Sequence, residues 1–541
     1  MTRYIFVVGG VMSGVGKGIA SASIGTILQS KGFRVSVLKI DPYINVDAGT
    51  MNPVEHGETF VTEDGMECDQ DLGTYERFLN QRVYAFNYMT TGGVYLAVIN
   101  RERNLEYNGR CVEVVPDIPN EVISRIKKAA QKTKAEIMIV EIGGTVGEYQ
   151  NMLFLEAGRM MRLENPKKVI FVMVSYLPIP KKIGEMKTKP TQYAVRTLNS
   201  AGIEPDFILA RSARPLDSFR KKKISIFCNI KGEAIISAPD VNFVYEVPLN
   251  FEKDHLGEMI LKKFGLRTRK KDLKNWRKQV KTYLSAKKKI KIALVGKYFQ
   301  SGDFTFADSY ISVIEAVKHG AISNFCQPEF HWFNAEDLEM KGARILEGMN
   351  GVIVPQGWGK RGNEGMIKAI KFCREKKKPF LGLCYGMQMA VIEFARNVCK
   401  LKKSNSEEID KKTPHPVIHL MPDQEKYLRE KQYGGTIRLG AWPCLLKKDS
   451  LLYKIYKKEK ISERHRHRYE FNNQYRELME KNGMIFSGTS PDGKLVEAIE
   501  IKNHPFFVGT QFHPEYQSSF LFAHPLFKEF VKTCLAHKSH H

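Results

Sequence analysis

Short apolar runs that alternate with helix-like patterns constrain the fold of this chain more than any other feature. Apolar runs of about four to eight residues, bounded by glycine, proline or charge, are typical of buried parallel strands with helices as crossovers. The first half contains such runs at residues 4–8, 34–40, 137–140, 169–174 and 207–209. This pattern predicts an α/β domain built around a doubly wound, mostly parallel sheet.

A second set of apolar runs begins after a strongly basic stretch, and it covers residues 292–295, 351–354, 380–383 and 506–509. The basic stretch has apolar residues at helical spacing, namely Leu273, Trp276, Val280 and Leu284, and its charge is that of a solvated connector. A chain of 541 residues is longer than one hydrophobic core usually organises. We therefore predict two doubly wound α/β domains, 1–266 and 291–541, joined by a basic linker helix at 267–290.

Composition excludes several classes of protein. The sequence is 43% hydrophobic and 26% charged, and it has no apolar stretch of the roughly 18 residues that would span a bilayer. It opens on a strand-like run without the layout of a signal peptide. Its nine cysteines form no CxxC pair, which suits reduced thiols in a cytoplasmic protein. We expect a cytoplasmic protein with no membrane partner.

The formal charge of +25 has three explanations: nucleic-acid binding, anionic small substrates, or a lysine-rich solvated surface. Lysine runs such as Lys221–Lys223 and Lys287–Lys289 lack the interleaved aromatic residues that stack on bases. We therefore expect anionic substrates and a solvated surface, and no nucleic acid.

A glycine-rich stretch, Gly9–Gly18, follows the first predicted strand and leads into a helical pattern. Its backbone N–H groups, the helix N-terminus and Lys17 would together bind phosphate oxygens. The spacing from Gly10 is one residue longer than in the Walker A motif, and Gly18 stands where Ser or Thr normally contacts Mg²⁺. The alternative is a tight glycine turn without a ligand.

Without that hydroxyl group, carboxylates elsewhere must hold the metal. Glu141 follows a predicted strand, and Asp71 ends an acidic stretch; Mg²⁺ is usually held by one or two carboxylates together with nucleotide oxygens. Capping or solvation is the alternative role for each. A further segment, Lys187–Gln192, combines two lysines, a proline and two threonines into a cradle suited to a triphosphate, unless it is a generic basic turn.

The second half contains a strand, the elbow Gly382-x-Cys384-x-Gly386 and a helix. This is the thiol counterpart of the nucleophile elbow, whose following N–H groups bind an oxyanion. A buried structural cysteine is the alternative. His513 and Glu515 end another predicted strand, so His513 would deprotonate Cys384 and Glu515 would orient the imidazole.

These motifs, in this order, resemble those of the CTP synthases over almost the whole chain. The glycine turn at 354–359 is suited to donating oxyanion N–H groups and completes a glutaminase pattern. The other stretches that carry the resemblance are 39–47, 56–58, 62–65, 75–78, 141–147, 434–440 and 464–470.

The resemblance implies a glutamine-dependent ligase that phosphorylates UTP with ATP and displaces the phosphate with ammonia cut from glutamine. Lys17 and Mg²⁺ on Asp71 and Glu141 would stabilise the moving charge. The ATP contacts it implies are Gly14, Val15, Gly16, Lys17, Gly18, Ile19, Asp71, Arg211, Pro239, Asp240 and Val241. The contacts to UTP, or to CTP, are Ser13, Glu148, Tyr149, Gln150, Lys187, Thr188, Lys189, Pro190, Thr191, Gln192 and Lys223.

The same resemblance implies that Arg468 binds the α-carboxylate of glutamine and that Glu408 faces its ammonium group. The other implied glutamine contacts are Gly357, Tyr385, Gly386, Met387 and Gln388. A homotetramer, activation by GTP and feedback inhibition by CTP are also implied.

The sequence departs from the family pattern at several positions. Gln356 and Trp358 replace a glycine and a phenylalanine beside Gly357, and Gln150 replaces an acidic residue. In the stretch that forms a lid in the family, the unusual residues are Asn108, Cys111, Glu113 and Asp117.

Three rival functions share some of these features. A cobyrinate amidase would share the glycine-rich start and the glutaminase, but the 187–192 and 41–47 stretches argue against it. A DNA-partitioning ATPase would have no use for Cys384, His513 and Glu515. Intact motifs in both halves argue against an inactive scaffold that polymerises.

Overall fold

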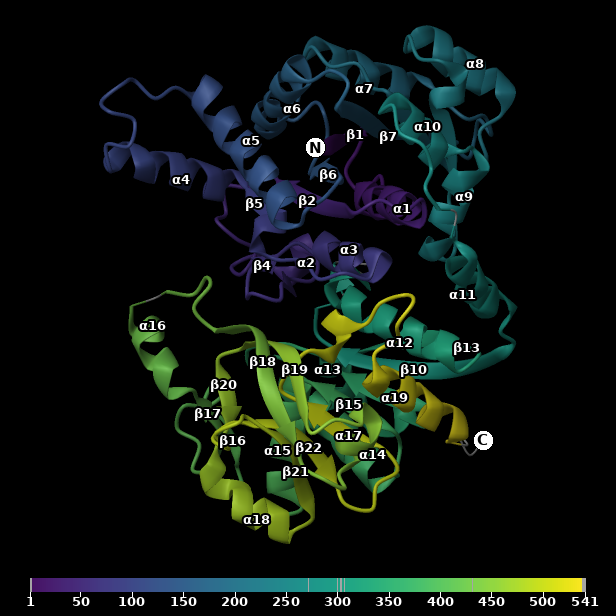
Figure 1. Ribbon diagram of the computed structural model, residues 1–541. Helices are drawn as coiled ribbons and strands as arrows, with labels where there is room; N and C mark the ends of the chain where they lie inside the picture. Colours follow the sequence, from purple (N-terminus) through teal and green to yellow (C-terminus); the bar gives the residue numbers. More distant parts are fainter. Residues whose placement is uncertain are drawn as a thin grey trace. The chain divides into compact units, whose positions relative to one another are not determined.

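The chain forms two compact units in the computed structural model, which describes residues 2–270, 272–298, 300–301, 304–305, 307–430 and 432–537. The first unit contains the chain up to Asp47 and Asp71–Val280, and the second contains Ala48–Gln70 and the chain from Lys281 onward (Figure 1). The segment 48–70 therefore leaves the first unit between two of its elements and belongs to the second. Nothing in the hydrophobic pattern predicted this excursion.

The first unit is built on a seven-stranded sheet in the order β5-β2-β6-β1-β7-β8-β9, and every neighbouring pair is parallel. Register is continuous at its centre, where Val7 lies opposite Glu141 on one side and Val172 on the other. The strands are β1 (Arg3–Gly10), β2 (Val35–Asp41), β5 (Tyr88–Thr90), β6 (Ile137–Ile142), β7 (Val169–Tyr176), β8 (Phe207–Ser212) and β9 (Ile235–Pro239).

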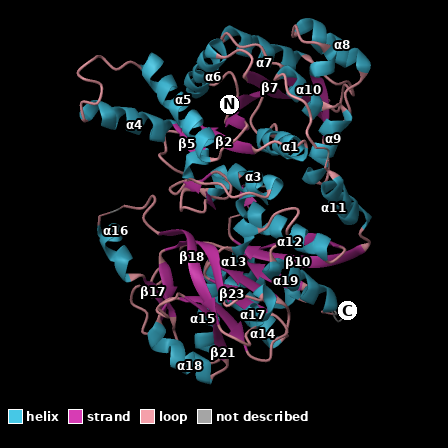
Figure 2. Ribbon diagram, in the orientation of Figure 1, coloured by secondary structure: helices cyan, strands magenta, loops and turns pink. Residues whose placement is uncertain are grey.

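Helices cover both faces of this sheet, as Figure 2 shows. One layer contains α1 (Lys17–Ser30), α3 (Asp71–Leu79), α9 (Val247–Lys253) and α10 (Leu256–Lys263). The other contains α4 (Thr91–Arg103), α5 (Val114–Lys132), α6 (Met152–Glu164), α7 (Lys189–Ser200) and α8 (Ser218–Phe227). The predicted doubly wound fold is confirmed, and the five predicted runs of this half coincide with strands.

The second unit contains a nine-stranded sheet in the order β13-β10-β14-β15-β23-β22-β21-β18-β19. The first five strands are parallel, and the remaining four extend the sheet in antiparallel fashion. The parallel strands are β10 (Lys288–Gly296), β13 (Cys326–Asn334), β14 (Gly351–Val354), β15 (Phe380–Leu383) and β23 (Phe507–Thr510), and the antiparallel ones are β18 (Arg438–Leu446), β19 (Lys460–His467), β21 (Met484–Thr489) and β22 (Val496–Ile501).

Helices also cover both faces of the second sheet. The core on one face includes α13 (Ala335–Lys341), α14 (Asn363–Glu375), α15 (Tyr385–Asn397) and α18 (Arg476–Lys481), and the core on the other includes α12 (Ile311–Ser323), α17 (Leu451–Tyr456) and α19 (Pro525–Ala536). A smaller sheet of β16 (Asn405–Ser406), β17 (Pro416–Leu420) and β20 (Tyr469–Phe471), with α16 (Glu425–Arg429), completes the unit. The excursion 48–70 contributes α2 (Pro53–His56) and a hairpin of β3 (Phe60–Val61) and β4 (Glu67–Cys68).

The predicted basic helix is present as α11 (Lys274–Ser285). It is more than a solvated connector, because Trp276 is buried, donates a hydrogen bond from Nε1 to the Tyr245 carbonyl at 2.7 Å, and packs on the Phe78 ring. Lys288–Ile290, which we assigned to the linker, already belongs to β10.

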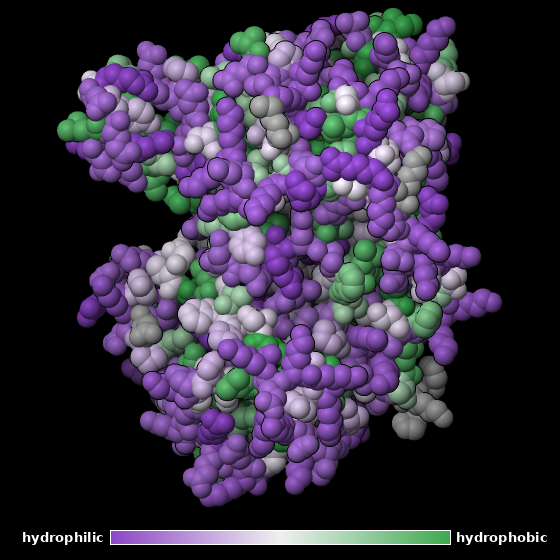
Figure 3. Space-filling view, viewed as in Figure 1, coloured by the Kyte–Doolittle hydropathy of each residue, from purple (hydrophilic) through white to green (hydrophobic). Residues whose placement is uncertain are grey.

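Among the residues described, no helix has both the length and the apolar character needed to cross a membrane. The molecular face drawn in Figure 3 is covered mainly by hydrophilic side chains.

Candidate functional site

The glycine-rich stretch is the turn between β1 and α1. Gly14 and Gly16 have φ values of 70° and 87°, which favour glycine, and Gly16 caps α1. Lys17 is buried at the start of this helix, and its Nζ donates to the Gly144 carbonyl at 2.6 Å. Burial and the nearby charge of Lys39 lower the pKa of Lys17, against the opposing effect of Glu141.

Gly18 explains why this loop departs from the Walker A pattern. A Cβ atom at Gly18 would overlap the Asp71 carboxylate, at the start of α3. A serine or threonine at this position would require the Asp71 carboxylate to move, because the carboxylate fills the space of its side chain. The Asp71 carboxylate, a candidate metal ligand, therefore lies beside the position that the hydroxyl group of a serine or threonine would take.

Asp71 and Glu141 are brought together by a buried lysine. Lys39 Nζ forms ion pairs with both carboxylates, at 2.9 Å for Glu141 Oε1, and the Tyr75 hydroxyl donates to Glu141 Oε2 at 2.6 Å. Glu141 is 0% exposed, and burial raises its pKa although Lys39 opposes the shift. Two carboxylates gathered around one cation are a donor set that fits Mg²⁺. Sequence reasoning gave no role to Lys39 or Tyr75.

A hollow of about 620 Å³, counting space that is open to solvent, lies beside this loop. Seven of the residues implied as ATP contacts lie on its walls: Val15, Gly16, Ile19, Arg211, Pro239, Asp240 and Val241. The remaining wall residues are apolar except for Asn250: Ala20, Val174, Leu209, Ala238, Val244, Val247 and Phe251. Arg211 donates to Asp240 Oδ1 at 2.8 Å and to the Gly14 carbonyl at 3.1 Å. It therefore connects the hollow to the glycine-rich turn.

The Lys187–Gln192 stretch forms the N-terminal end of α7. Thr191 is buried and its hydroxyl lies 2.8 Å from that of Ser175, while Gln192 donates to the Thr188 hydroxyl at 3.1 Å. Lys187 pairs with Glu185 at 2.7 Å. Ser13 and Lys223, two further predicted contacts of UTP, are exposed.

The residues that differ from the family pattern at positions 148–150 and 117 make defined contacts. Glu148 accepts the Thr145 N–H at 2.8 Å and the Gln150 amide at 2.9 Å, while Tyr149 is 95% exposed. The Asp117 carboxylate binds the Arg110 guanidinium and accepts the Glu113 N–H at 2.9 Å, and hydrogen bonding from Arg110 lowers the pKa of Asp117. Asp117, which lies in α5, therefore holds Arg110 and Glu113 of the stretch that forms a lid in the family.

In the second unit, Cys384 occupies a strained elbow between β15 and α15. Its φ of 51° and ψ of −98° are rare for a residue with a side chain, as expected of a nucleophile elbow. A Cβ atom at Gly386 would overlap the Val354 carbonyl, so the close approach requires glycine. The Cys384 Sγ lies 3.5 Å from the Gln511 amide and 3.6 Å from the Arg466 carbonyl.

His513 and Glu515 follow β23, whose Thr510 carbonyl accepts the Cys384 N–H at 2.7 Å. His513 Nδ1 lies 2.7 Å from Glu515 Oε1, and both side chains are buried. Burial lowers the pKa of His513, but the negative charges of Glu515 and Cys384 outweigh it and raise this pKa to about 10. The environment therefore favours the imidazolium form of His513.

The turn after β14 is held by several side chains. The Gly359 carbonyl accepts hydrogen bonds from Lys297 Nζ at 3.0 Å and from the Tyr385 hydroxyl at 2.7 Å, and the Gly359 N–H donates to Glu408 at 2.6 Å. Burial lowers the pKa of Lys297 to about 8 and raises that of Glu408. Arg468 donates to the Thr436 hydroxyl at 3.0 Å. Sequence reasoning missed Lys297.

The predicted glutamine contacts Met387 and Gln388 are buried in the first turn of α15. The Gln388 amide donates to the Tyr469 carbonyl at 3.0 Å and to Gln511 at 3.2 Å. Gly357 is buried, with its Cα facing the Lys297 and Tyr385 side chains.

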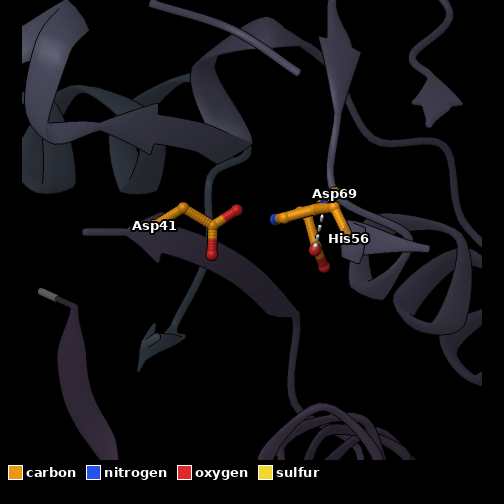
Figure 4. A group of neighbouring side chains, drawn as sticks. All are labelled: Asp41, His56 and Asp69. Carbon is orange, nitrogen blue, oxygen red and sulfur yellow. Dashed lines mark ion pairs between the residues drawn. The ribbon is translucent and has the colours of Figure 1, made fainter. Parts of the chain in front are cut away.

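The excursion 48–70 packs against this glutaminase-like site within the second unit. Glu67 accepts a hydrogen bond from Arg466 at 2.8 Å, and Glu63 accepts one from the buried Arg464 at 3.0 Å. His56 and Asp69 form an ion pair of 3.6 Å inside the excursion, which Figure 4 marks with a dashed line. No motif in the sequence indicated these contacts.

Comparisons with known proteins match both halves of the chain. A family model for the CTP synthase N-terminus matches residues 3–266, and one for the class-I glutamine amidotransferases matches residues 305–533. The chain is 48% identical to a CTP synthase of Nostoc punctiforme over 99% of this chain and 97% of that protein. It is also 48% identical to one from Thermococcus gammatolerans, over 99% of both chains.

Solved structures include the glutaminase domain of the Trypanosoma brucei CTPS with bound acivicin. It is 34% identical, covers 46% of this chain and 95% of its own, and has a TM-score of 0.42.

Proposed function

Because the chain belongs to the CTP synthase family, we propose that Lys17 serves the ATP-dependent activation of UTP and Cys384 releases the ammonia. Members of this family are glutamine-hydrolysing ligases of pyrimidine biosynthesis. The observation that carries the residue assignment is the joint presence of two sites. The Asp71 carboxylate lies beside Gly18 of the glycine-rich turn. The buried His513–Glu515 pair follows β23, the strand next to β15, which leads into the Cys384 elbow.

In the ligase reaction, ATP transfers its γ-phosphoryl group to O4 of uracil, which converts a poor leaving group into phosphate. Ammonia then attacks C4, and the C4–O4 bond breaks. Lys17 and the neighbouring Lys39 place positive charge where the phosphoryl oxygens gain negative charge. Asp71 and Glu141 would hold Mg²⁺, which neutralises phosphate charge when bound.

We assign the base of ATP to the 620 Å³ hollow, since its apolar walls suit a planar ring and Arg211 and Asp240 offer polar contacts at its rim. The UTP triphosphate is assigned to the N-terminal end of α7. Backbone N–H groups and Lys187 and Lys189 there favour an anion. Ser13 and Lys223 complete this proposed set.

In the glutaminase reaction, the Cys384 thiolate attacks the amide carbon of glutamine, and the C–N bond breaks as His513 gives its proton to the departing ammonia. Water, deprotonated by His513, then hydrolyses the thioester and releases glutamate. Glu515 keeps the imidazole oriented through its 2.7 Å contact. The N–H groups of Gly357 and Tyr385 are assigned to the oxyanion.

Recognition of glutamine itself is assigned to charged groups near the elbow. Glu408, whose backbone contact is the Gly359 N–H, would bind the ammonium group, and Arg468 would bind the carboxylate. Arg468 has a buried NH1 with no hydrogen-bond partner among the described residues, which supports a ligand at this guanidinium.

For regulation, assembly and location, the proposal adopts what the resemblance implies: a homotetramer activated by GTP, inhibited by CTP and active in the cytoplasm. None of the nine cysteines forms a disulfide, which supports a reducing compartment.

The proposal is tested by following the nitrogen atom. The protein is incubated with UTP, ATP, Mg²⁺ and glutamine labelled with ¹⁵N in the amide group. We expect labelled CTP and unlabelled glutamate, whereas CTP that forms only with ammonium chloride would overturn the assignment of Cys384.

A further inference from the structure

Gln356 occupies a position in the turn after β14 from which it reaches the excursion 48–70. It directly precedes Gly357, the proposed oxyanion donor, and its Nε2 donates to Glu58 Oε1 at 3.0 Å. The side chain is half-buried, and its Oε1 atom is buried with no hydrogen-bond partner among the described residues. A half-buried amide that uses only its donor side depends on that one acceptor for its position.

Glu58 is itself firmly held. Its side chain is 2% exposed, and Oε2 accepts the Ser312 N–H at 3.1 Å near the start of α12. Its own N–H donates to the Asp308 carbonyl at 3.1 Å. The carboxylate therefore connects three elements: the excursion, the start of α12 and the turn that carries Gly357.

The residue after Glu58 reaches the other side of the glutaminase-like site. The Thr59 carbonyl accepts a hydrogen bond from the Tyr516 hydroxyl at 3.1 Å. The Tyr516 ring stacks on His513, with centroids 4.9 Å apart and planes 11° from parallel. Two consecutive residues of the excursion thus contact the oxyanion turn and the aromatic neighbour of the general base.

A hollow of about 300 Å³ borders this contact, and Glu58, Thr59, Gln356, Gly357 and Tyr516 lie on its walls. The Gln356 amide is a directional contact that holds the turn on the side of this hollow.

We propose that Gln356 is a positioning residue that fixes the oxyanion turn to Glu58, so that the rate of glutamine hydrolysis depends on the placement of the excursion 48–70. The inference rests on the roles proposed above for Cys384 and Gly357. The excursion continues directly into Asp71, a proposed metal ligand, so the backbone connects the nucleotide site to Glu58 without interruption. Nucleotide binding that moves the end of the excursion would therefore alter glutamine hydrolysis.

A charge-swap experiment tests the proposal. Gln356→Glu places a second carboxylate against Glu58, and we expect kcat for glutamine hydrolysis to fall by about tenfold or more. In the double variant Glu58→Gln/Gln356→Glu, residue 58 donates to residue 356 and still accepts the Ser312 N–H. This variant is expected to recover to within about threefold of the parent.

Three further measurements separate positioning from folding and from binding. Each variant is assayed for CTP formation with ammonium chloride, which should stay within about twofold of the parent. The KM for glutamine should change less than kcat, because the oxyanion turn acts in the transition state. Stimulation of glutamine hydrolysis by ATP plus UTP should be weaker in Gln356→Ala than in the parent.

The outcomes are distinguishable. If the double variant folds but hydrolyses glutamine no faster than Gln356→Glu, the proposed contact is wrong. If Gln356→Glu also loses ammonia-dependent synthesis, the test relies on Gln356→Ala instead. Glutamine hydrolysis at the parental rate in Gln356→Ala, with parental stimulation by ATP plus UTP, would overturn the proposal. Cys384→Ala is run in parallel, and residual glutamine hydrolysis there would overturn the catalytic assignment instead.

Discussion

Replacing Glu515 by glutamine removes the charge that makes His513 a strong base while leaving the size of the side chain almost unchanged. The Glu515 carboxylate lies 2.7 Å from His513 Nδ1 in a site where both side chains are at most 1% exposed. Its charge, with that of Cys384, raises the pKa of His513 to about 10 despite burial. A glutamine amide in its place carries no negative charge to stabilise the His513 imidazolium. The amide can also hydrogen-bond to the unproductive tautomer of the neutral imidazole.

Removing one partner of a buried ion pair costs about 3–5 kcal/mol. At about 1.4 kcal/mol for each factor of ten, kcat/KM for glutamine hydrolysis should fall by about two to four orders of magnitude. The pKa of His513 should fall as well. The imidazolium form of His513 is lost above its pKa, so the alkaline limb of the pH profile should move to lower pH.

The assay measures glutamate release between about pH 6 and 10, with ammonia-dependent CTP formation as the internal reference. A matched control exists in Glu463→Gln, because Glu463 also pairs with a buried histidine, His524, at 3.0 Å in the same unit. That variant should lose stability without the same loss of glutamine hydrolysis. A Glu515→Gln protein that keeps more than about a third of parental kcat/KM would refute the triad.

Three further predictions concern the ligase half. Lys17→Ala and Asp71→Asn should each abolish CTP formation with glutamine and with ammonium chloride, because both residues serve phosphoryl transfer; normal ammonia-driven turnover in either would remove the assigned phosphate site. Asn108→Leu should bring the glutamate-to-CTP ratio at low GTP closer to one, because a polar residue in the lid admits water and lets ammonia leak; a parental ratio already at one and unchanged would dismiss this. Gln150→Glu, which replaces the amide that donates to Glu148, should lower the CTP inhibition constant about tenfold at unchanged KM for UTP; equal inhibition constants would end that hypothesis.

The sequence was most informative where local pattern and chemistry coincide. The apolar runs that became β1, β6, β14 and β15 are buried on both faces, so hydrophobicity alone marks them. The Cys384 elbow was predictable because the close approach of Gly386 to Val354 can be met only by glycine.

The missed features depend on contacts between residues far apart in the sequence. β18 mixes buried residues with half-buried and exposed ones. β19 carries buried charged residues such as Arg464, whose partner is Glu63. Lys39 and Lys297 are buried because carboxylates and carbonyl groups surround them, and no local pattern reveals such partners. The excursion 48–70 is short and polar in places, so its association with the second unit had no sequence signal.

The most direct test of the division between the two catalytic sites uses Cys384→Ala and one measurement, the rate of CTP formation from UTP and ATP with each nitrogen source. The substitution removes the sulfur that attacks glutamine and leaves Lys17, Asp71 and Glu141 unchanged. We predict no detectable CTP from glutamine and a rate with ammonium chloride close to that of the parent. Equal loss with both nitrogen sources, or continued synthesis from glutamine, would contradict the account.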